Sequence, residues 1–198
     1  METGTANDKN QLYPVFLKLE QLRILLVGGG NVAMEKLTSL LLNSPKARIT
    51  LVAPFVRNEV KDFLANYPAC QIVERPFEAG DIQDKELIFL TTDNPQLHED
   101  IKIMASGKGI LVNVADTPDL CDFYLGSIVQ KGSLKIAIST NGKSPTLARR
   151  LKEFFNEVLP DEIETAVTNL NTIRNNIHSG FKERVKQLNE LTASLIRY

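Results

Sequence analysis

The first half of the chain alternates short, mostly apolar runs with longer segments in which apolar residues recur at helical spacing. The runs predict buried strands, because a strand covered on both faces is apolar throughout. They cover residues 24–27, 48–52, 71–74, 87–90 and 110–114. The intervening segments, such as residues 96–106, have the apolar periodicity of amphipathic helices. This alternation predicts an α/β fold with a Rossmann-type parallel sheet.

The first predicted strand runs directly into a glycine-rich turn. Gly28, Gly30 and Ala33 follow the spacing G-x-G-x-x-A, which is typical of dinucleotide-binding loops. The first small residue lets the chain turn sharply, the second lets backbone approach a pyrophosphate, and the third lets the helix lie close to the strand. The N–H groups at the helix start then face the anion. Residues 1–115 are therefore predicted to form a dinucleotide-binding domain, with residues 1–12 as a disordered start.

After Pro118 the pattern changes. Residues 127–129 and 134–140 are separated by a turn sequence, and the second run alternates with period two, so together they predict an antiparallel hairpin. A helix then begins with Ser144 as its N-cap and Pro145 at its first position. We assign residues 116–145 to a hairpin, dimerisation and active-site region, and residues 146–198 to a C-terminal helical region.

The C-terminal region is predicted to contain helices that each carry one apolar stripe. Asp161 and Glu164 have the spacing of a capping box at the start of one of them. The stripes comprise Leu147, Leu151, Phe154, Phe155, Val158, Ile163, Val167, Leu170, Ile173, Ile177, Phe181, Val185, Leu188, Leu191 and Leu195. One hairpin cannot cover so much apolar surface, and a large exposed apolar patch is unusual in a monomer. The chain is therefore predicted to form a homodimer.

Composition narrows the class of protein without identifying it. The 198 residues are 43% hydrophobic and 24% charged with a net charge of −1, which is typical of a soluble globular protein and argues against nucleic-acid binding. No apolar run approaches the roughly 18 residues of a membrane span, and the polar first residues lack the basic and apolar blocks of a signal peptide. We expect a cytoplasmic protein without nucleic-acid or membrane partners.

The cysteines and histidines predict no metal site. Cys70 and Cys121 are far apart and form no C-x-x-C, so we interpret both as packing residues. His98 and His178 have no metal-binding spacing with each other or with a cysteine, and we expect both on helix surfaces.

Several segments together carry a resemblance to a known family. They are residues 28–33, residues 114–118 (VADTP), residues 123–128 and, most specifically, residues 138–149 (ISTNGKSPTLAR). In this order they resemble the siroheme synthase family, and more narrowly its precorrin-2 dehydrogenase/sirohydrochlorin ferrochelatase module. The resemblance extends from about residue 13 to the C-terminus. Larger siroheme synthases also carry a methyltransferase domain, for which we expect no room in this chain.

The resemblance implies an enzyme that oxidises precorrin-2 to sirohydrochlorin with NAD⁺, and it leaves open whether Fe²⁺ is then inserted as a further substrate. Asp116 matches the aspartate that the family pattern ties to both activities, as the general base of one shared cleft. It also follows a buried strand at the carboxyl edge of the sheet, where open α/β folds bind ligands. The alternative is that Asp116 only caps the turn before Pro118, with Asp119 and Asp122 as nearby rivals.

Two sets of binding residues complete the prediction. A substrate rich in carboxylates calls for cations and N–H donors, although such residues are often only solvated surface. The predicted substrate-binding residues are Ser139, Thr140, Asn141, Gly142, Lys143, Ser144 and Arg149. The predicted cofactor-binding residues are Gly28, Gly30, Asn31, Val32, Ala53, Pro54, Phe55 and Thr92.

The choice between NAD and NADP is less defined. Many NAD-binding folds place an acid about 20 residues after the glycines, but here the second strand ends in Ala53-Pro54-Phe55. Arg57 would suit the 2′-phosphate of NADP, so the residues alone allow either cofactor. NAD is favoured by the resemblance only.

Two other classes of protein use a glycine-loop Rossmann fold. A dinucleotide-sensing regulatory domain would carry an acid at the end of the second strand and a small β domain after it. An unrelated NAD-dependent dehydrogenase would carry a catalytic Lys, Tyr or His in a separate domain. Neither pattern is visible in this sequence, which favours the precorrin-2 dehydrogenase, with or without chelatase activity.

Overall fold

The computed structural model describes residues 10–177 and 180–193. Residues 1–9 of the predicted disordered start, together with His178 and Leu195, lie outside the described residues. The chain divides into two compact units, Met1–Tyr124 and Leu125–Tyr198, which we call the first unit and the second unit. The predicted region boundaries at residues 115 and 145 stay predictions.

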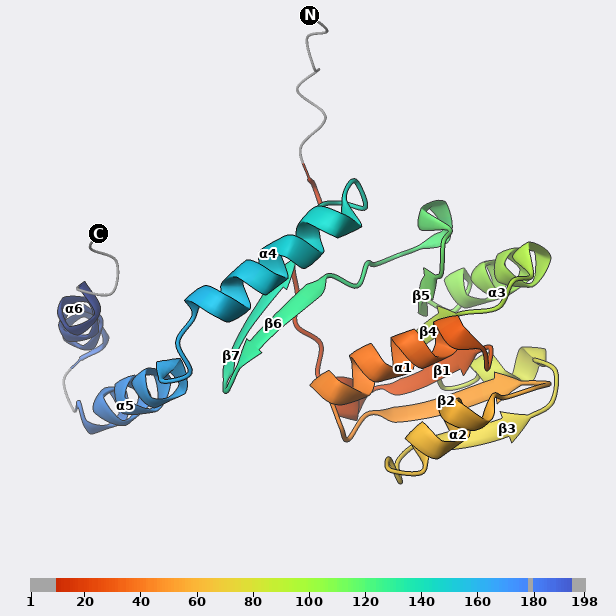
Figure 1. Cartoon of the computed structure of the whole chain (residues 1–198), viewed down its shortest axis with the longest axis horizontal. Helices are drawn as coiled ribbons and strands as arrows, with labels where there is room; N and C mark the ends of the chain where they lie inside the picture. Colours follow the sequence, from red (N-terminus) through yellow and green to blue (C-terminus); the bar gives the residue numbers. More distant parts are fainter. Residues whose placement is uncertain (1–9, 178–179, 194–198) are drawn as a thin grey trace, which may run out of the picture. The chain divides into compact units, whose positions relative to one another are not determined.

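A five-stranded parallel sheet forms the centre of the first unit (Figure 1). In sheet order its strands are β3 (Gln71–Glu74), β2 (Arg48–Ala53), β1 (Arg23–Val27), β4 (Leu87–Leu90) and β5 (Leu111–Val114). The chain builds outward from β1 to β3 and then returns to the other side of β1, so the strand order reverses between β1 and β4. Open α/β sheets bind ligands at such a reversal, outside the carboxyl ends of the strands. The predicted Rossmann-type fold is confirmed.

Helices pack on both faces of this sheet because the side chains of a strand alternate between its faces. Ile24 and Leu26 of β1 belong to the core shared with α1 (Asn31–Asn43) and α2 (Asn58–Leu64). Leu25 and Val27 belong to the other core, shared with α3 (Pro95–Ser106). These four side chains are at most 2% exposed, and burying one such side chain contributes about 1.5–3 kcal/mol. Short 3₁₀ turns lie at η1 (Leu19–Gln21), η2 (Ala79–Ile82) and η3 (Pro118–Leu120).

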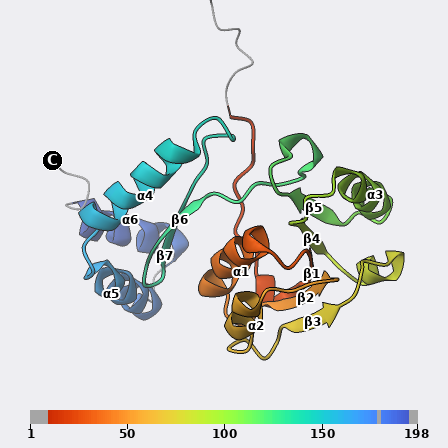
Figure 2. The same ribbon diagram turned by 45° about the vertical axis from the view of Figure 1, so that its right-hand side comes forward.

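The second unit begins with the predicted antiparallel hairpin, β6 (Ser127–Lys131) and β7 (Leu134–Ile138). Its tight turn includes Gly132 at φ 54°, a left-handed conformation that favours glycine. Helix α4 (Pro145–Val158) packs along this hairpin (Figure 2). It begins as predicted, with Pro145 at its first position and Ser144 Oγ accepting a hydrogen bond from Leu147 N at 3.2 Å.

The predicted capping box at the start of α5 (Ile163–Asn176) is wrong. The N-cap residue of α5 is Glu162, which makes no side-chain cap hydrogen bond. Asp161 instead forms an ion pair with Lys131 of β6, and Glu164 accepts hydrogen bonds from the backbone N and the Oγ of Ser133, at 2.5 and 3.0 Å. The two carboxylates therefore tie α5 to the hairpin turn, because a lysine and the donors of that turn lie within reach.

The helices of the second unit leave much of their apolar surface uncovered within one chain. Leu147, Phe154 and Val158, which lie on one stripe of α4, are each more than half exposed. The same holds for Phe181 and Leu191 of α6 (Phe181–Thr192). Among the described residues of this unit, the fully buried apolar side chains are Val129 and Ala148. The unit therefore has little core of its own.

Candidate functional site

The glycine loop connects β1 to α1 at the point where the strand order reverses. Gly28 has φ 119°, and its backbone N donates a hydrogen bond to Val52 O at 3.0 Å. A side chain is excluded here for two reasons. The φ of 119° is a conformation that residues other than glycine rarely adopt, and a Cβ atom on Gly28 would lie 2.5 Å from Thr91 Oγ1. Thr91 in turn is buried and donates its hydroxyl hydrogen bond to Val27 O at 2.9 Å. Gly28 thus lets the loop pack directly against the end of β4.

The next two glycines face opposite environments. A Cβ atom on Gly29 would lie 2.4 Å from the backbone oxygen of Phe55, and Gly29 O accepts a hydrogen bond from Arg57 N at 3.0 Å. A Cβ atom on Gly30 would point into open space. Gly29 was not in the predicted site, but it binds the glycine loop to the loop that follows β2. Gly30 is the position where a ligand can approach the backbone.

The start of α1 is suited to bind an anion. Gly30 is the N-cap residue of α1 and makes no side-chain cap hydrogen bond, and the first turn contains no acid. The N–H groups of Asn31 and Val32 have no acceptor inside the helix, since the first turn of any helix lacks one. Together with the helix dipole these donors attract a phosphate group. Ala33 is fully buried, which allows α1 to lie close to β1.

A hollow of about 470 Å³ opens beside this loop. It is lined by Gly30, Asn31, Phe55, Arg57, Asn58 and Glu59. Three predicted cofactor residues, Gly30, Asn31 and Phe55, therefore come together, and Phe55 is 71% exposed. Of the other predicted cofactor-binding residues, Gly28 and Ala53 are buried, Pro54 is exposed, and Val32 and Thr92 are half-buried.

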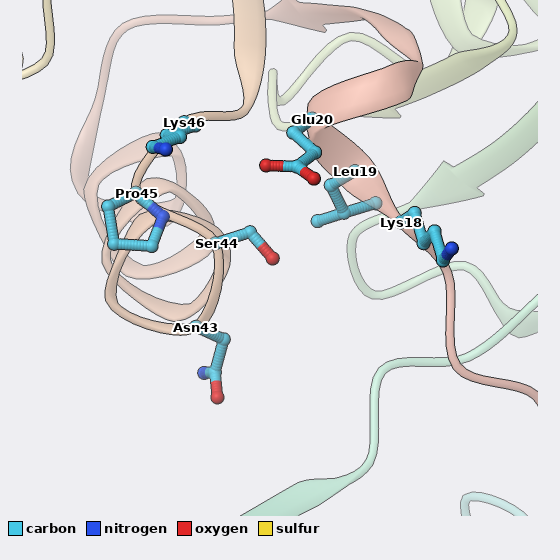
Figure 3. Close-up of a pocket in the computed structure, with 7 residues that line it drawn as sticks. All are labelled: Lys18, Leu19, Glu20, Asn43, Ser44, Pro45 and Lys46. Carbon is cyan, nitrogen blue, oxygen red and sulfur yellow. The ribbon is translucent and has the colours of Figure 1, made fainter. Parts of the chain in front are cut away.

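A second hollow, of about 460 Å³, lies at the opposite end of the sheet, before β1 and β2 begin. Figure 3 shows the residues that line it. Lys18, Leu19, Glu20 and residues 43–46 line it, where α1 ends and β2 begins. The glycine loop and the start of α1 line the first hollow and not the second, so the predicted cofactor residues gather at the first. At the second hollow α1 presents carbonyl groups, which repel anions.

Asp116 lies in the turn that follows β5, at the same carboxyl edge of the sheet. Its φ is 57°, a left-handed conformation that is uncommon for residues other than glycine and that marks many functional sites. The side chain is exposed and has no hydrogen-bond or ion-pair partner among the residues that the structure describes. Asp116 is thus presented to solvent by a turn with a left-handed backbone.

The residues around this turn hold it in place. The Sγ of Cys121 lies 3.2 Å from both the N and the O of Val114. Asn113 is buried and donates from Nδ2 to Phe123 O at 2.8 Å. Asp122 accepts a hydrogen bond from Val112 N at 2.8 Å and forms an ion pair with Lys102. Asp122 is therefore committed to structure, whereas Asp119 in η3 is exposed and remains a rival of Asp116.

His98 is not on the surface, contrary to the prediction. It is 5% exposed on α3, and its Nε2 lies 2.8 Å from the Oγ1 of Thr92, a predicted cofactor residue. Burial lowers the pKa of His98, an effect that a hydrogen bond with the backbone of Thr92 and the charge of Asp93 offset only in part. The buried positions of α3 are His98, Ile101 and Ala105, so the imidazole lies on the face that packs on the sheet.

The predicted substrate residues form one turn and the start of α4, in the second unit. Asn141 and Gly142 have φ 55° and 75°. The hydroxyl oxygens of Ser139, Thr140 and Ser144 accept backbone hydrogen bonds from Asn141, Ser144 and Leu147, at 3.1 to 3.2 Å. Arg149 is exposed and lies 3.7 Å from Glu153. The hydroxyl groups thus stabilise the turn as acceptors, and each can still donate one hydrogen bond outward.

Within the described ranges, residues 10–177 and 180–193, no helix is long and apolar enough to span a bilayer. Within the same ranges no three His, Cys, Asp or Glu side chains are grouped to hold a metal ion. Cys70 and Cys121 are free thiols and are partly buried.

The sheet and the glycine loop define a dinucleotide-binding protein of the Rossmann type. Residues 15–127 match the family model described as "Putative NAD(P)-binding", and this match covers more than half of the chain. The chain therefore belongs to this NAD(P)-binding family. Residues 131–156 match a second model, described as "Sirohaem biosynthesis protein central".

Relatives confirm the resemblance carried by the sequence motifs. The siroheme synthase of Pseudoalteromonas atlantica is 38% identical over 153 residues, which cover 77% of this chain and 32% of that protein. The siroheme synthase of Methylococcus capsulatus is 35% identical over 174 residues, which cover 88% and 34%. The chain thus spans about a third of the length of these relatives. Its fold is similar to that of "SirC, precorrin-2 dehydrogenase", with a TM-score of 0.73, 24% identity, and coverage of 91% and 89%.

The buried, neutral His98 should make stability depend on pH. The unfolded chain binds a proton at His98 near the ordinary histidine pKa of about 6.5, whereas the folded state binds it only at lower pH. The stability linked to His98 is therefore fully present above about pH 6.5 and is lost as pH falls through the folded-state pKa. We expect His98→Gln, which does not titrate, to reduce the stability lost between about pH 7.5 and pH 5.5 by about 1 kcal/mol or less.

Urea unfolding of both proteins at the two pH values measures this difference. His178 is present in both proteins, so its contribution cancels. An equal loss of stability in parent and variant would mean that His98 titrates alike in the folded and unfolded states.

Proposed function

We propose that this chain oxidises precorrin-2 to sirohydrochlorin with NAD⁺ as the hydride acceptor. The observation that carries the proposal is the combination, on one sheet edge, of a glycine loop with open space at Gly30 and of Asp116, an exposed carboxylate that pairs with none of the described residues. The match of residues 131–156 to a sirohaem biosynthesis model supports the tetrapyrrole substrate, as do the siroheme synthase relatives. The NAD(P)-binding family supports the cofactor.

The residues of the first unit fit a bound dinucleotide. Gly30 leaves room for a pyrophosphate, and the N–H groups of Asn31 and Val32 are available to donate to it. Phe55 offers an exposed ring on the β2 side of the loop for the adenine base. On the other side, β4 separates β1 from β5, so the Asp116 turn is two strand spacings, or about 10 Å, from the glycine loop.

Asp116 would act as the base of the reaction. When bound, NAD⁺ supplies the group that takes a hydride from the substrate. Removing that hydride leaves a cation that must lose a proton, and the exposed, unpaired carboxylate of Asp116 can accept it. The same carboxylate favours a second candidate activity, insertion of Fe²⁺ as a substrate, because both pyrrole N–H protons of sirohydrochlorin must then be removed.

We also propose that the turn at residues 139–144 and Arg149 bind carboxylates of the substrate. Support comes from the start of α4, whose dipole favours anions, and from the exposed guanidinium of Arg149. The hydroxyl groups of Ser139, Thr140 and Ser144, which act as acceptors within the turn, can each also donate one hydrogen bond. The cytoplasmic location expected from the sequence stays a prediction.

The activity of Asp116 variants tests the proposed chemistry. Asparagine tolerates a left-handed backbone as aspartate does, so Asp116→Asn should keep the turn at φ 57° while removing the base. We expect NAD⁺ affinity and folding to be unchanged and the rate of sirohydrochlorin formation to fall about 10²- to 10⁴-fold. Any Fe²⁺ insertion should fall with it. Absorbance assays with precorrin-2 and NAD⁺, followed by added Fe²⁺, measure both rates.

Asp119→Asn is the matched control, because Asp119 is also exposed and lies three residues away in η3. It should retain the parent rates. If Asp116→Asn retained them instead, Asp116 would only shape its turn, and the base would have to be sought at Asp119 or a water molecule.

We propose a homodimer assembled through the apolar stripes of the second unit. The exposed Leu147, Phe154 and Val158 of α4 support this proposal, since the described chain leaves them uncovered. Sedimentation at about micromolar concentration should give a dimer for the parent and a monomer for Phe154→Asp, because an interface of standard size does not tolerate a buried unpaired charge. Ile103→Asp, at an exposed position of α3, should remain dimeric. A monomeric parent would refute the assignment.

A further inference from the structure

The hollow beside the glycine loop contains an acid that the usual sequence pattern does not reveal. Glu59 lies in the first turn of α2 and lines the hollow together with Gly30 and Asn31. The hydrogen bond from Arg57 N to Gly29 O holds the start of α2 against the glycine loop. The ribose-binding acid expected at the end of β2 is missing from Ala53-Pro54-Phe55, yet a carboxylate still faces this space, from the next element of the chain.

Glu59 is paired with the cation that would otherwise favour a phosphate. Arg57 Nε lies 3.2 Å from Glu59 Oε2, and Arg57 Nη2 lies 3.0 Å from Glu59 Oε1, so the contact is bidentate. The hydrogen bond from Arg57 is the largest cause of the lowered pKa of Glu59, which therefore stays charged at neutral pH. The carboxylate also accepts a hydrogen bond from the backbone N–H of Glu59 itself, and its two oxygens, with about four acceptor positions in all, keep capacity for a further donor.

We propose that the Arg57–Glu59 pair makes this site select NAD over NADP. The inference rests on the proposed function, in which the hollow holds the adenosine half of the cofactor. Free hydroxyl groups on the adenosine ribose would donate to the remaining lone pairs of Glu59. The 2′-phosphate of NADP would meet the negative charge of Glu59, and the guanidinium of Arg57 is already engaged.

The same pair contributes little to folding, which makes it suitable for a test. The side chains of Arg57 and Glu59 are 42% and 64% exposed, and exposed ion pairs add little to stability. Glu59→Gln should therefore fold normally. It removes the negative charge and frees Arg57 to bind a phosphate.

Calorimetric titration of the whole chain with NAD⁺ and with NADP⁺ measures the selectivity as the ratio of the two dissociation constants. We expect Glu59→Gln to reduce the preference for NAD⁺ by about tenfold or more, through weaker NAD⁺ binding and stronger NADP⁺ binding. Adding Arg57→Gln to this variant should abolish the gain in NADP⁺ affinity, because the freed cation is then absent.

Glu74→Gln is the matched control. It makes the same charge change and breaks a comparable exposed ion pair to α2, between Glu74 and Lys61 at 2.7 Å, but Glu74 does not line the hollow. The ratio of the dissociation constants for NAD⁺ and NADP⁺ should be the same in Glu74→Gln as in the parent. A preference in Glu59→Gln within about twofold of the parent's would overturn the proposal while leaving NAD⁺ use intact. A parent that bound neither dinucleotide would overturn the proposed function as well.

Discussion

The close contact between backbone segments at the glycine loop is the constraint on which the rest of the first unit depends. Gly28 packs on Thr91 at the end of β4, and Gly29 packs on Phe55 after β2. Neither position has room for a Cβ atom, so three loops meet within van der Waals distance at one point of the sheet edge. This contact brings the segment after β2, the start of α1 and the segment after β4 around a common space. Only Gly30 remains open toward that space.

The contact also organises the charges of the site. The first N–H groups of α1 have no acceptor within the helix. The hydrogen bond from Arg57 N to Gly29 O holds Arg57 and Glu59 beside these groups. Thr92, on the β4 side, is oriented by the buried imidazole of His98. The carboxylate of Asp116 lies in the turn after β5, the last strand of the sheet order. A cofactor lying along this edge would have its phosphates beside the N–H donors of α1. Its other end would lie toward the carboxylate of Asp116.

The sequence predicts the sheet well because its inner strands β1 and β4 are buried on both faces and are therefore apolar over residues 24–27 and 87–90. The glycine loop is predicted equally well, because the spacing of its small residues reflects a steric requirement. The partners of single polar side chains cannot be predicted in this way, because they lie on elements far apart in the sequence. Glu164 has the spacing of a capping residue but bonds to Ser133 across the unit, and His98 has a polar side chain but is buried against Thr92.

Glu59 was missed for a related reason. The sequence pattern looks for an acid at the end of β2, whereas the acid that faces the hollow lies in the first turn of α2. Its one sequence signal is its position two residues after Arg57, a spacing that by itself says nothing about a hollow. For Asp116, the buried strand just before it in the sequence predicted its place at the carboxyl edge of the sheet. Its left-handed backbone, and the fact that it pairs with none of the described residues, are properties of the folded turn alone.

The most direct test of the account is the affinity for NAD⁺ of a Gly30→Asp variant, measured by calorimetry. A Cβ atom added at Gly30 has no atom within 4 Å, so the variant should fold as the parent does, while its carboxylate occupies and charges the space assigned to the pyrophosphate. Gly80→Asp, at another open glycine, controls for the substitution itself. The account predicts at least about tenfold weaker NAD⁺ binding for Gly30→Asp alone. Parent-like affinity in a folded Gly30→Asp protein would contradict it and reduce the glycine loop to a turn.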